Sequence, residues 1–79
     1  MKEIQDTTLA AILGSERDER APEFGERAWR LRGNVADVIY WDLGNGWCDI
    51  IRVVPTETGE VADQWLQRFF DRVEASDDR

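Results

Sequence analysis

Histidine is missing from this 79-residue chain, and lysine and cysteine occur once each, as Lys2 and Cys48. Without histidine, a general base near neutral pH has to be a carboxylate, cysteine, lysine or tyrosine with a shifted pKa. One cysteine forms no disulfide within the chain, and a zinc site needs several Cys or His ligands. We therefore expect no catalytic residues, no metal site and no cofactor.

Long apolar runs are also missing. No stretch approaches the roughly 20 residues of a membrane-spanning helix, and the start, MKEIQDTTLAAILG, makes a poor signal peptide. A single unpaired cysteine suits a reducing compartment. We expect one cytoplasmic domain over residues 1–79. Because so short a chain buries a limited core, a second subunit is the stabilising device that remains open.

Positive charge is scarce. The chain has 17 acids against 10 bases, for a net charge of −7. Residues 28–55 are balanced, whereas residues 1–27 and 56–79 carry seven acids each. A negative surface repels nucleic acid and membrane phosphates and attracts basic protein surfaces. We expect no direct binding to nucleic acid or membrane, and a protein partner with a basic surface. The alternative is that these acids only keep the protein soluble.

Two helices are expected, one near each end. The sequence DTT from Asp6 is a helix-start signal, and Gly14 ends the apolar pattern that follows. Residues 1–25 are thus expected to form an N-terminal helix and an acidic loop. Residues 58–75 are apolar at every third or fourth position, which predicts an amphipathic helix, and residues 76–79 are expected to fray.

Between these helices, residues 26–54 alternate with a period of two and are rich in Val, Ile and Trp. Gly33-Asn34 and Asn45-Gly46 are two-residue hairpin signatures, since both turns favour positive φ. This pattern predicts a three-stranded antiparallel meander. The expected fold class is α+β, in the order helix, three strands, helix.

The hairpin signatures also predict the register. An Asn45-Gly46 loop places Leu43 opposite Cys48 and Asp42 opposite Asp49, and it puts Trp41 and Trp47 on opposite faces. A Gly33-Asn34 loop places Trp29 opposite Val38 and Arg30 opposite Asp37.

Both faces of the expected sheet are mainly apolar, so each should be covered. Either the two helices sandwich the sheet, or they lie together and leave one face to another subunit or a partner. The candidate interface is the face that carries three arginines and a tryptophan, types enriched at binding hot spots. Its residues are Ile39, Trp41, Leu43, Cys48, Ile50 and Arg52.

Two features of the second hairpin leave several interpretations open. Asp42 opposite Asp49 would be repulsive, so this acidic pair is hydrated, meets an arginine of a partner, or belongs to a catalytic or metal site. Cys48 is either a small buried residue of the sheet or one half of a disulfide across a dimer axis.

The C-terminal helix carries a stripe of acids at spacings of one or two turns. They are Glu60, Asp63, Asp71 and Glu74. Arg68 and Arg72 are expected to interrupt this charge. The stripe is either a partner-binding surface or the ordinary polar face of an amphipathic helix.

In type, the chain resembles the small acidic anti-defence proteins of phages and mobile elements, including anti-CRISPR proteins. The likeness rests on length, on the acidic stretches SERDERAPEFGE, TETGEVAD and DRVEASDD, and on a Trp-rich α+β core without catalytic residues. It implies an inhibitor that binds a nucleoprotein effector and blocks its access to nucleic acid. The alternative is a small homodimeric structural or adaptor protein.

Overall fold

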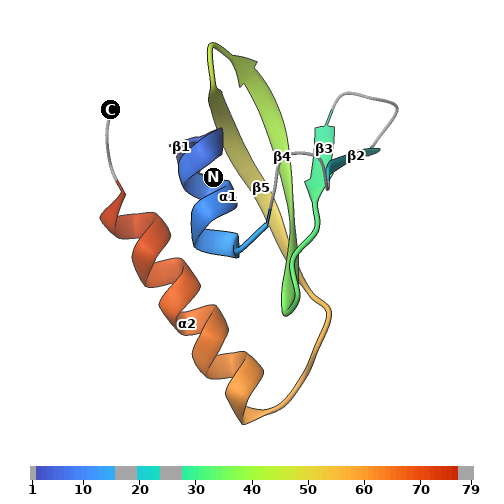
Figure 1. Ribbon diagram of the computed structural model, residues 1–79, viewed down its shortest axis with the longest axis vertical. Coiled ribbons are helices and arrows are strands. Elements are labelled where there is room, and N and C mark those ends of the chain that lie inside the picture. Colours follow the sequence, from blue (N-terminus) through green and yellow to red (C-terminus); the bar gives the residue numbers. More distant parts are fainter. Residues whose placement is uncertain (1, 16–19, 24–27, 77–79) are drawn as a thin grey trace.

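The computed structural model describes residues 2–15, 20–23 and 28–76, folded as an antiparallel sheet with two helices (Figure 1). The elements are β1 (Lys2–Gln5), α1 (Asp6–Leu13), β2 (Arg20–Glu23), β3 (Ala28–Leu31), β4 (Ala36–Gly44), β5 (Trp47–Pro55) and α2 (Glu60–Ala75). The five strands are ordered β1-β5-β4-β3-β2. The predicted α+β class and antiparallel sheet are confirmed, and the predicted number of three strands is wrong.

The two unexpected strands, β1 and β2, are the edges of the sheet. Each has four residues, and β1 has a single buried side chain, Ile4. β2 contains Pro22, which is tolerated at an edge because it has no N–H to donate to the ladder. The acidic loop expected within residues 1–25 lies partly outside the described residues, and its described part is strand β2. Residues 77–79 of the expected tail are also outside them.

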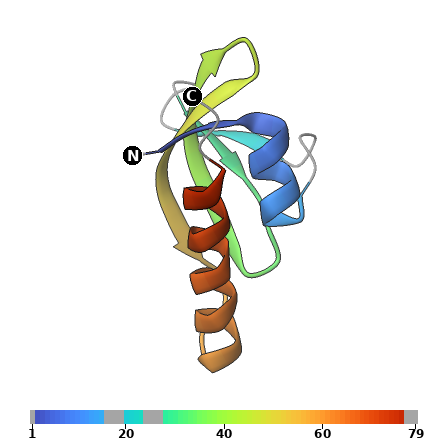
Figure 2. The same ribbon diagram turned by 90° about the vertical axis from the view of Figure 1, so that its left-hand side faces the viewer.

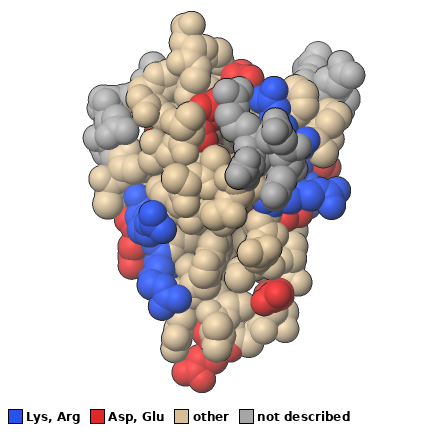
Figure 3. All heavy atoms as spheres, viewed as in Figure 1, with Lys and Arg blue, Asp and Glu red and all other residues tan. Residues whose placement is uncertain are grey.

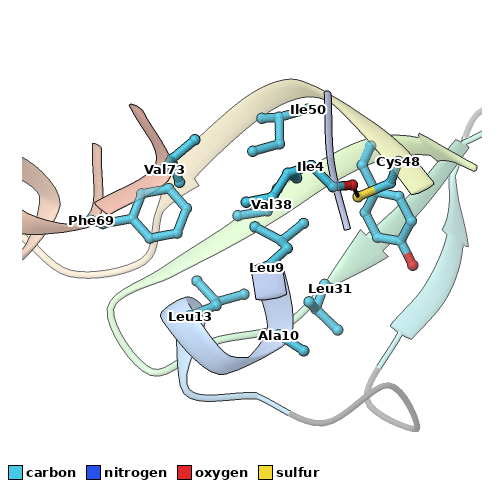
Figure 4. Close-up of a cluster of buried hydrophobic side chains, with 11 residues drawn as sticks. Ile4, Leu9, Ala10, Leu13, Leu31, Val38, Cys48, Ile50, Phe69 and Val73 are labelled. Carbon is cyan, nitrogen blue, oxygen red and sulfur yellow. Dashed lines mark hydrogen bonds between the residues drawn. The ribbon is translucent and has the colours of Figure 1, made fainter. Parts of the chain in front are cut away.

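Both helices lie next to each other on one face of the sheet (Figure 2). This arrangement decides between the two alternatives left by the sequence, because the helices do not sandwich the sheet. The close-up shows side chains of α1, α2 and the sheet converging in one core (Figure 4). The buried members are Ile4, Leu9, Ala10, Leu13, Leu31, Val38, Tyr40, Cys48, Ile50, Phe69 and Val73. We call the opposite side of the sheet the outer face.

The two hairpin signatures have different outcomes. Asn45 and Gly46 have φ of 56° and 82° and form a two-residue loop between Gly44 and Trp47, as predicted. The predicted Gly33-Asn34 loop is wrong, because pairing of β3 with β4 ends at Leu31 and Val38. Trp29 therefore faces Tyr40 instead of Val38. The two-residue shift keeps every side chain of β3 on its expected face.

Gly33 is needed for space. A Cβ atom at this position would lie 2.5 Å from the Ala36 carbonyl oxygen and 3.0 Å from the Leu13 side chain of α1. We expect Gly33→Ala to lower the free energy of unfolding by about 1–3 kcal/mol, the usual cost of overpacking. Urea denaturation measures it. The neighbouring exposed Asn34→Ala is the control and should change stability by about 0.5 kcal/mol or less; equal losses would contradict the steric explanation.

Two β-bulges change the predicted register of the second hairpin. Ile39 pairs with Arg52 but Tyr40 pairs with Ile50, so Ile51 is an extra residue in β5. Nearer the turn, Asp42 pairs with Cys48 and Gly44 with Trp47, which leaves Leu43 as an extra residue in β4. Side chains alternate between the two faces of a strand. An extra residue therefore puts the side chains beyond it on the face opposite to the one predicted without a bulge.

Candidate protein-binding surfaces

The acidic stripe predicted at a partner contact is exposed on α2. Its four residues, which we call the acidic face of α2, are Glu60, Asp63, Asp71 and Glu74. At about 100° per residue they fall within an arc of about 80°. Ala62, Phe69 and Val73 are buried on the other side of the same helix. Packing against the sheet therefore directs all four carboxylates toward solvent.

The arginines of α2 do not interrupt this face. On ideal helical geometry Arg68 and Arg72 lie about 100° and 140° around the axis from its centre. Both are exposed, and Figure 3 shows basic side chains gathered on one flank of α2, with carboxylates beyond them at the margin. The acidic face is thus a negative strip of two pairs of acids, with the neutral Gln67 between the pairs, bordered by a basic flank.

The position of each acid along α2 shows whether helix stability accounts for its charge. Glu60 and Asp63 lie in the first turn, where negative charge complements the helix dipole. Asp71 accepts a hydrogen bond from Gln67 Nε2 at 3.2 Å. Glu74 lies in the last turn, where a negative charge opposes the dipole by roughly 0.3–1 kcal/mol. Helix stability therefore explains the two N-terminal acids and not Glu74.

The six residues predicted at the sheet interface do not share one face, which corrects that prediction. The bulge at Ile51 turns Cys48 and Ile50 into the core, where they are 1% and 2% exposed. Without that extra residue they would share the face of Ile39 and Trp41. The predicted apolar patch is therefore divided between the core and the surface.

On the outer face, Ile39 is only 2% exposed although it lies outside the main core cluster. Its cross-strand partners are Arg30 of β3 and the exposed Arg52 of β5. Trp41 and Leu43 remain the large apolar side chains of the hairpin that stay open to solvent, 38% and 45% exposed. Among the interface candidates, these two are the apolar residues that a partner can reach.

The predicted acidic pair does not form. Asp42 pairs with Cys48 on the core face, whereas Asp49 pairs with Trp41 on the outer face and with Glu3 of β1. Asp42 Oδ1 accepts a hydrogen bond from the Gly44 amide at 2.9 Å, which holds the bulge before the turn. The two aspartates thus lie on opposite sides of the hairpin, and the like-charge cross-strand pair that Asp49 does form is with Glu3.

The prediction that Trp41 and Trp47 lie on opposite faces is also wrong. Trp47 alternates with Asp49 along β5, and Asp49 is the partner of Trp41, so both tryptophans lie on the outer face. The bulge at Leu43 is the reason. The outer face near the turn is therefore more aromatic than the sequence suggested.

Cys48 is enclosed by the core at the base of the same hairpin. Its Sγ–H donates to the Ile4 carbonyl oxygen at 3.4 Å. Burial, and to a lesser extent the negative fields of Asp6, Asp42 and Asp49, raise the pKa of the Cys48 thiol to about 12. A buried, protonated thiol is a poor nucleophile. The predicted alternative of a small buried sheet residue fits this geometry, and a disulfide between subunits would require the core to open.

An ion-pair cluster that register alone did not reveal joins three strands on the outer face. Arg30 Nε donates to Glu23 Oε2 at 3.0 Å and Arg30 Nη1 to Asp37 Oδ2 at 3.1 Å. Asp37 Oδ1 also accepts the Gly33 amide at 3.2 Å. Arg30 was predicted directly opposite Asp37; it faces Ile39 and reaches Asp37 diagonally. All three charged residues of this cluster therefore have a structural role on the outer face.

Within residues 2–15, 20–23 and 28–76, the structure contains no pocket and no group of three His, Cys, Asp or Glu side chains placed to hold a metal ion. Across the same described residues, neither helix has the length and apolar character needed to cross a membrane. Comparison of the chain with protein-family models, with curated proteins and with solved structures finds no match.

Proposed function

We propose that this protein is a non-enzymatic inhibitor of the anti-CRISPR type that acts in the host-cell cytoplasm. It binds a basic surface of a nucleoprotein effector and blocks the access of nucleic acid to that surface. The acidic face of α2 supplies the carboxylates of the contact. The proposal rests on protein binding through charge, so it requires no cofactor, metal or membrane.

The observation that carries this proposal is the position of the acids on α2. All four carboxylates are exposed within one arc, and Glu74 lies where negative charge weakens the helix. The last turn also contains Arg72, which complements the dipole, but Arg72 lies outside the acidic face, and the last-turn residue on that face is Glu74. A negative strip that continues to the end of the helix favours a binding role.

The strip has a length suited to a nucleic-acid-binding channel. Glu74 lies fourteen positions after Glu60, which corresponds to about 21 Å along the helix. Arginines and lysines that contact phosphates would meet carboxylates instead, so bound inhibitor and bound nucleic acid exclude each other. Because the contact is electrostatic, its association rate and affinity fall as salt is added.

Binding to a labelled nine-arginine peptide, followed by fluorescence anisotropy, tests whether this face directs cation binding. We expect the double variant Asp71→Asn, Glu74→Gln to weaken binding about fivefold in 20 mM NaCl, because two exposed charges leave the contact. The wild-type affinity should fall at least about tenfold between 20 and 150 mM NaCl.

The control is Glu57→Lys, which reverses one exposed charge outside the acidic face of α2 and gives the same net charge of −5. If both variants lose equal affinity, net charge alone attracts the peptide and the acidic face of α2 has no special role.

Affinity capture from host lysate tests whether the protein binds an effector in competition with nucleic acid. Immobilised wild-type protein should retain a nucleic-acid-binding protein, and duplex DNA or RNA should displace it. The Asp71→Asn, Glu74→Gln variant should retain less of that protein than the matched control does. Retention that nucleic acid leaves unchanged would contradict competition for a shared surface.

A further inference from the structure

The end of the β4–β5 hairpin forms a second surface, separate from α2. The hairpin extends past the rest of the sheet in both ribbon views (Figures 1 and 2). Residues 41–46 are all exposed, and they include Trp41 and Leu43. Leu43 is the extra residue of the bulge, which removes it from the pairing ladder. We call Trp41, Asp42 and Leu43, with the turn that follows them, the hairpin tip.

The hairpin tip is held in a defined conformation. Asn45 and Gly46 adopt the positive φ that a tight turn requires, and Asp42 Oδ1 holds the Gly44 amide at 2.9 Å. The Asp6 amide at the start of α1 donates to the Gly46 carbonyl oxygen at 2.8 Å and ties the turn to α1. Side chains displayed on an ordered backbone lose little entropy when they bind.

The charge around the hairpin tip is negative. Trp41, Asp49 and Glu3 follow one another across β4, β5 and β1 in a single row on the outer face. Residues 2–6 and 41–49 together contain four acids and one base, for a net charge of −3. In Figure 3 the end of the hairpin is uncharged, with carboxylates just below it. An exposed tryptophan in a negative field is suited to an arginine side chain, through stacking and charge.

We propose that the hairpin tip docks a protein segment in which arginine alternates with an apolar side chain. Trp41 stacks on the guanidinium, Leu43 contacts the apolar side chain, and the surrounding carboxylates select positive charge. This proposal is independent of the acidic face of α2, which lies on another element.

The exposed apolar area argues for a short segment over a second copy of the chain. A stable dimer buries about 1,200–2,000 Å² in total around a hydrophobic centre. Here the large apolar contribution is two side chains, each less than half exposed, and Ile39 beside them is already covered. A segment of a few residues has an apolar surface of about the size that these two side chains can cover.

A titration of ¹⁵N-labelled protein with the acetylated, amidated pentapeptide RLRLR tests the proposal. We expect chemical-shift changes at the Trp41 indole N–H and at the amides of residues 41–46. The peptide RGRGR has equal charge and no leucine, and we expect it to bind at least about threefold more weakly. An unchanged hairpin tip in the wild-type titration overturns the proposal, whether the peptide binds α2 or nothing.

The variant Trp41→Thr, Leu43→Thr should abolish the shifts at the hairpin tip and leave the rest of the spectrum in place. Its control is Val61→Ala, Phe70→Ala, which removes the other two exposed large apolar side chains of the described chain. That control should bind RLRLR as the wild type does. Equal loss in both variants, or sedimentation as a dimer lost in the threonine variant, overturns the assignment of a peptide.

The outcome here and the outcome for α2 are distinguishable. The α2 variant Asp71→Asn, Glu74→Gln should leave the RLRLR shifts at the hairpin tip within about twofold of wild-type affinity. Loss of these shifts in the α2 variant would show that the peptide binds α2, which overturns the hairpin proposal and leaves the proposed inhibitor function standing.

Discussion

Replacing Phe69 with alanine is expected to lower the free energy of unfolding by about 3–5 kcal/mol. Phe69 is 2% exposed and stacks on Trp65 with ring centroids 5.4 Å apart. It lies in the core with Val73 of the same helix and Leu9 of α1. Because single domains are stable by only about 5–15 kcal/mol, the loss removes a large part of the total. Urea denaturation followed by far-UV circular dichroism measures it.

The adjacent phenylalanine is the matched control. Phe70 is 44% exposed and meets the edge of Phe69 with centroids 5.6 Å apart. Phe70→Ala should cost about 1 kcal/mol, the scale of one aromatic pair. The same residue type one position along the helix thus separates packing from helix propensity. Similar losses in both variants would show that α2 is not anchored through the face that contains Phe69.

This anchoring matters for function because it determines which side of α2 faces solvent. Phe69, with Ala62 and Val73, directs one side of the helix to the sheet. The acidic face lies on the other side in consequence. If Phe69→Ala keeps a folded sheet at low temperature, α2 should be less well ordered in it, and its affinity for the nine-arginine peptide should fall. Phe70→Ala should bind this peptide as the wild type does.

The sequence predicts those parts of the fold that local chemistry determines. Apolar spacing and Gly14, which has φ of 76°, place the first helix. The period near 3.6 places the second helix and its acidic side, and Asn45-Gly46 places one hairpin turn. Each of these signals depends on residues close together in the chain.

What the sequence does not predict depends on distant neighbours. β1 and β2 have no alternating apolar pattern and become strands because β5 and β3 offer them free edges. Gly33 signals a turn by composition, but its role is to leave room for Leu13 and the Ala36 carbonyl group. Tertiary packing overrides local preference at both places.

The bulges account for the errors in the candidate sites. Ile50 and Ile51 are both apolar, so nothing in the sequence shows which of them enters the core. In the structure Ile50 joins the core together with Cys48, the cross-strand partner of Ile4, and Ile51 is left as the extra residue. The acidic face of α2 contains no such irregularity, and its geometry follows directly from helical spacing.

The second large effect expected is a loss of stability at alkaline pH that depends on Cys48. Burial raises the pKa of the thiol from 9.0 to about 12 in the folded protein. Between these values the unfolded chain releases the proton and the folded chain keeps it. The unfolded state therefore binds fewer protons, and the free energy of unfolding falls as pH rises. The stability contribution is complete below about pH 9 and lost progressively toward pH 12.

The slope approaches about 1.4 kcal/mol per pH unit within this window. From pH 9 to pH 11 we expect Cys48 to account for a loss of about 2 kcal/mol. In Cys48→Ala this component should be absent, so the stability of the variant should fall less steeply. Urea denaturation at pH 8, 9, 10 and 11 gives the difference in slope, and at pH 8 an intact native state should also protect the thiol of the wild type from a disulfide reagent.

Tyr40 provides the control, because burial raises its pKa above 10.0 in the same core, although a hydrogen bond to Arg20 opposes the shift. Tyr40 loses its contribution only above about pH 10, whereas Cys48 acts from about pH 9. Tyr40→Phe should therefore match the wild-type slope between pH 9 and pH 10, where Cys48→Ala already departs from it. If Cys48→Ala and the wild type lose stability in parallel, the thiol reaches water in the folded state. That result would support the alternative in which Cys48 forms a disulfide between subunits, which its buried position argues against.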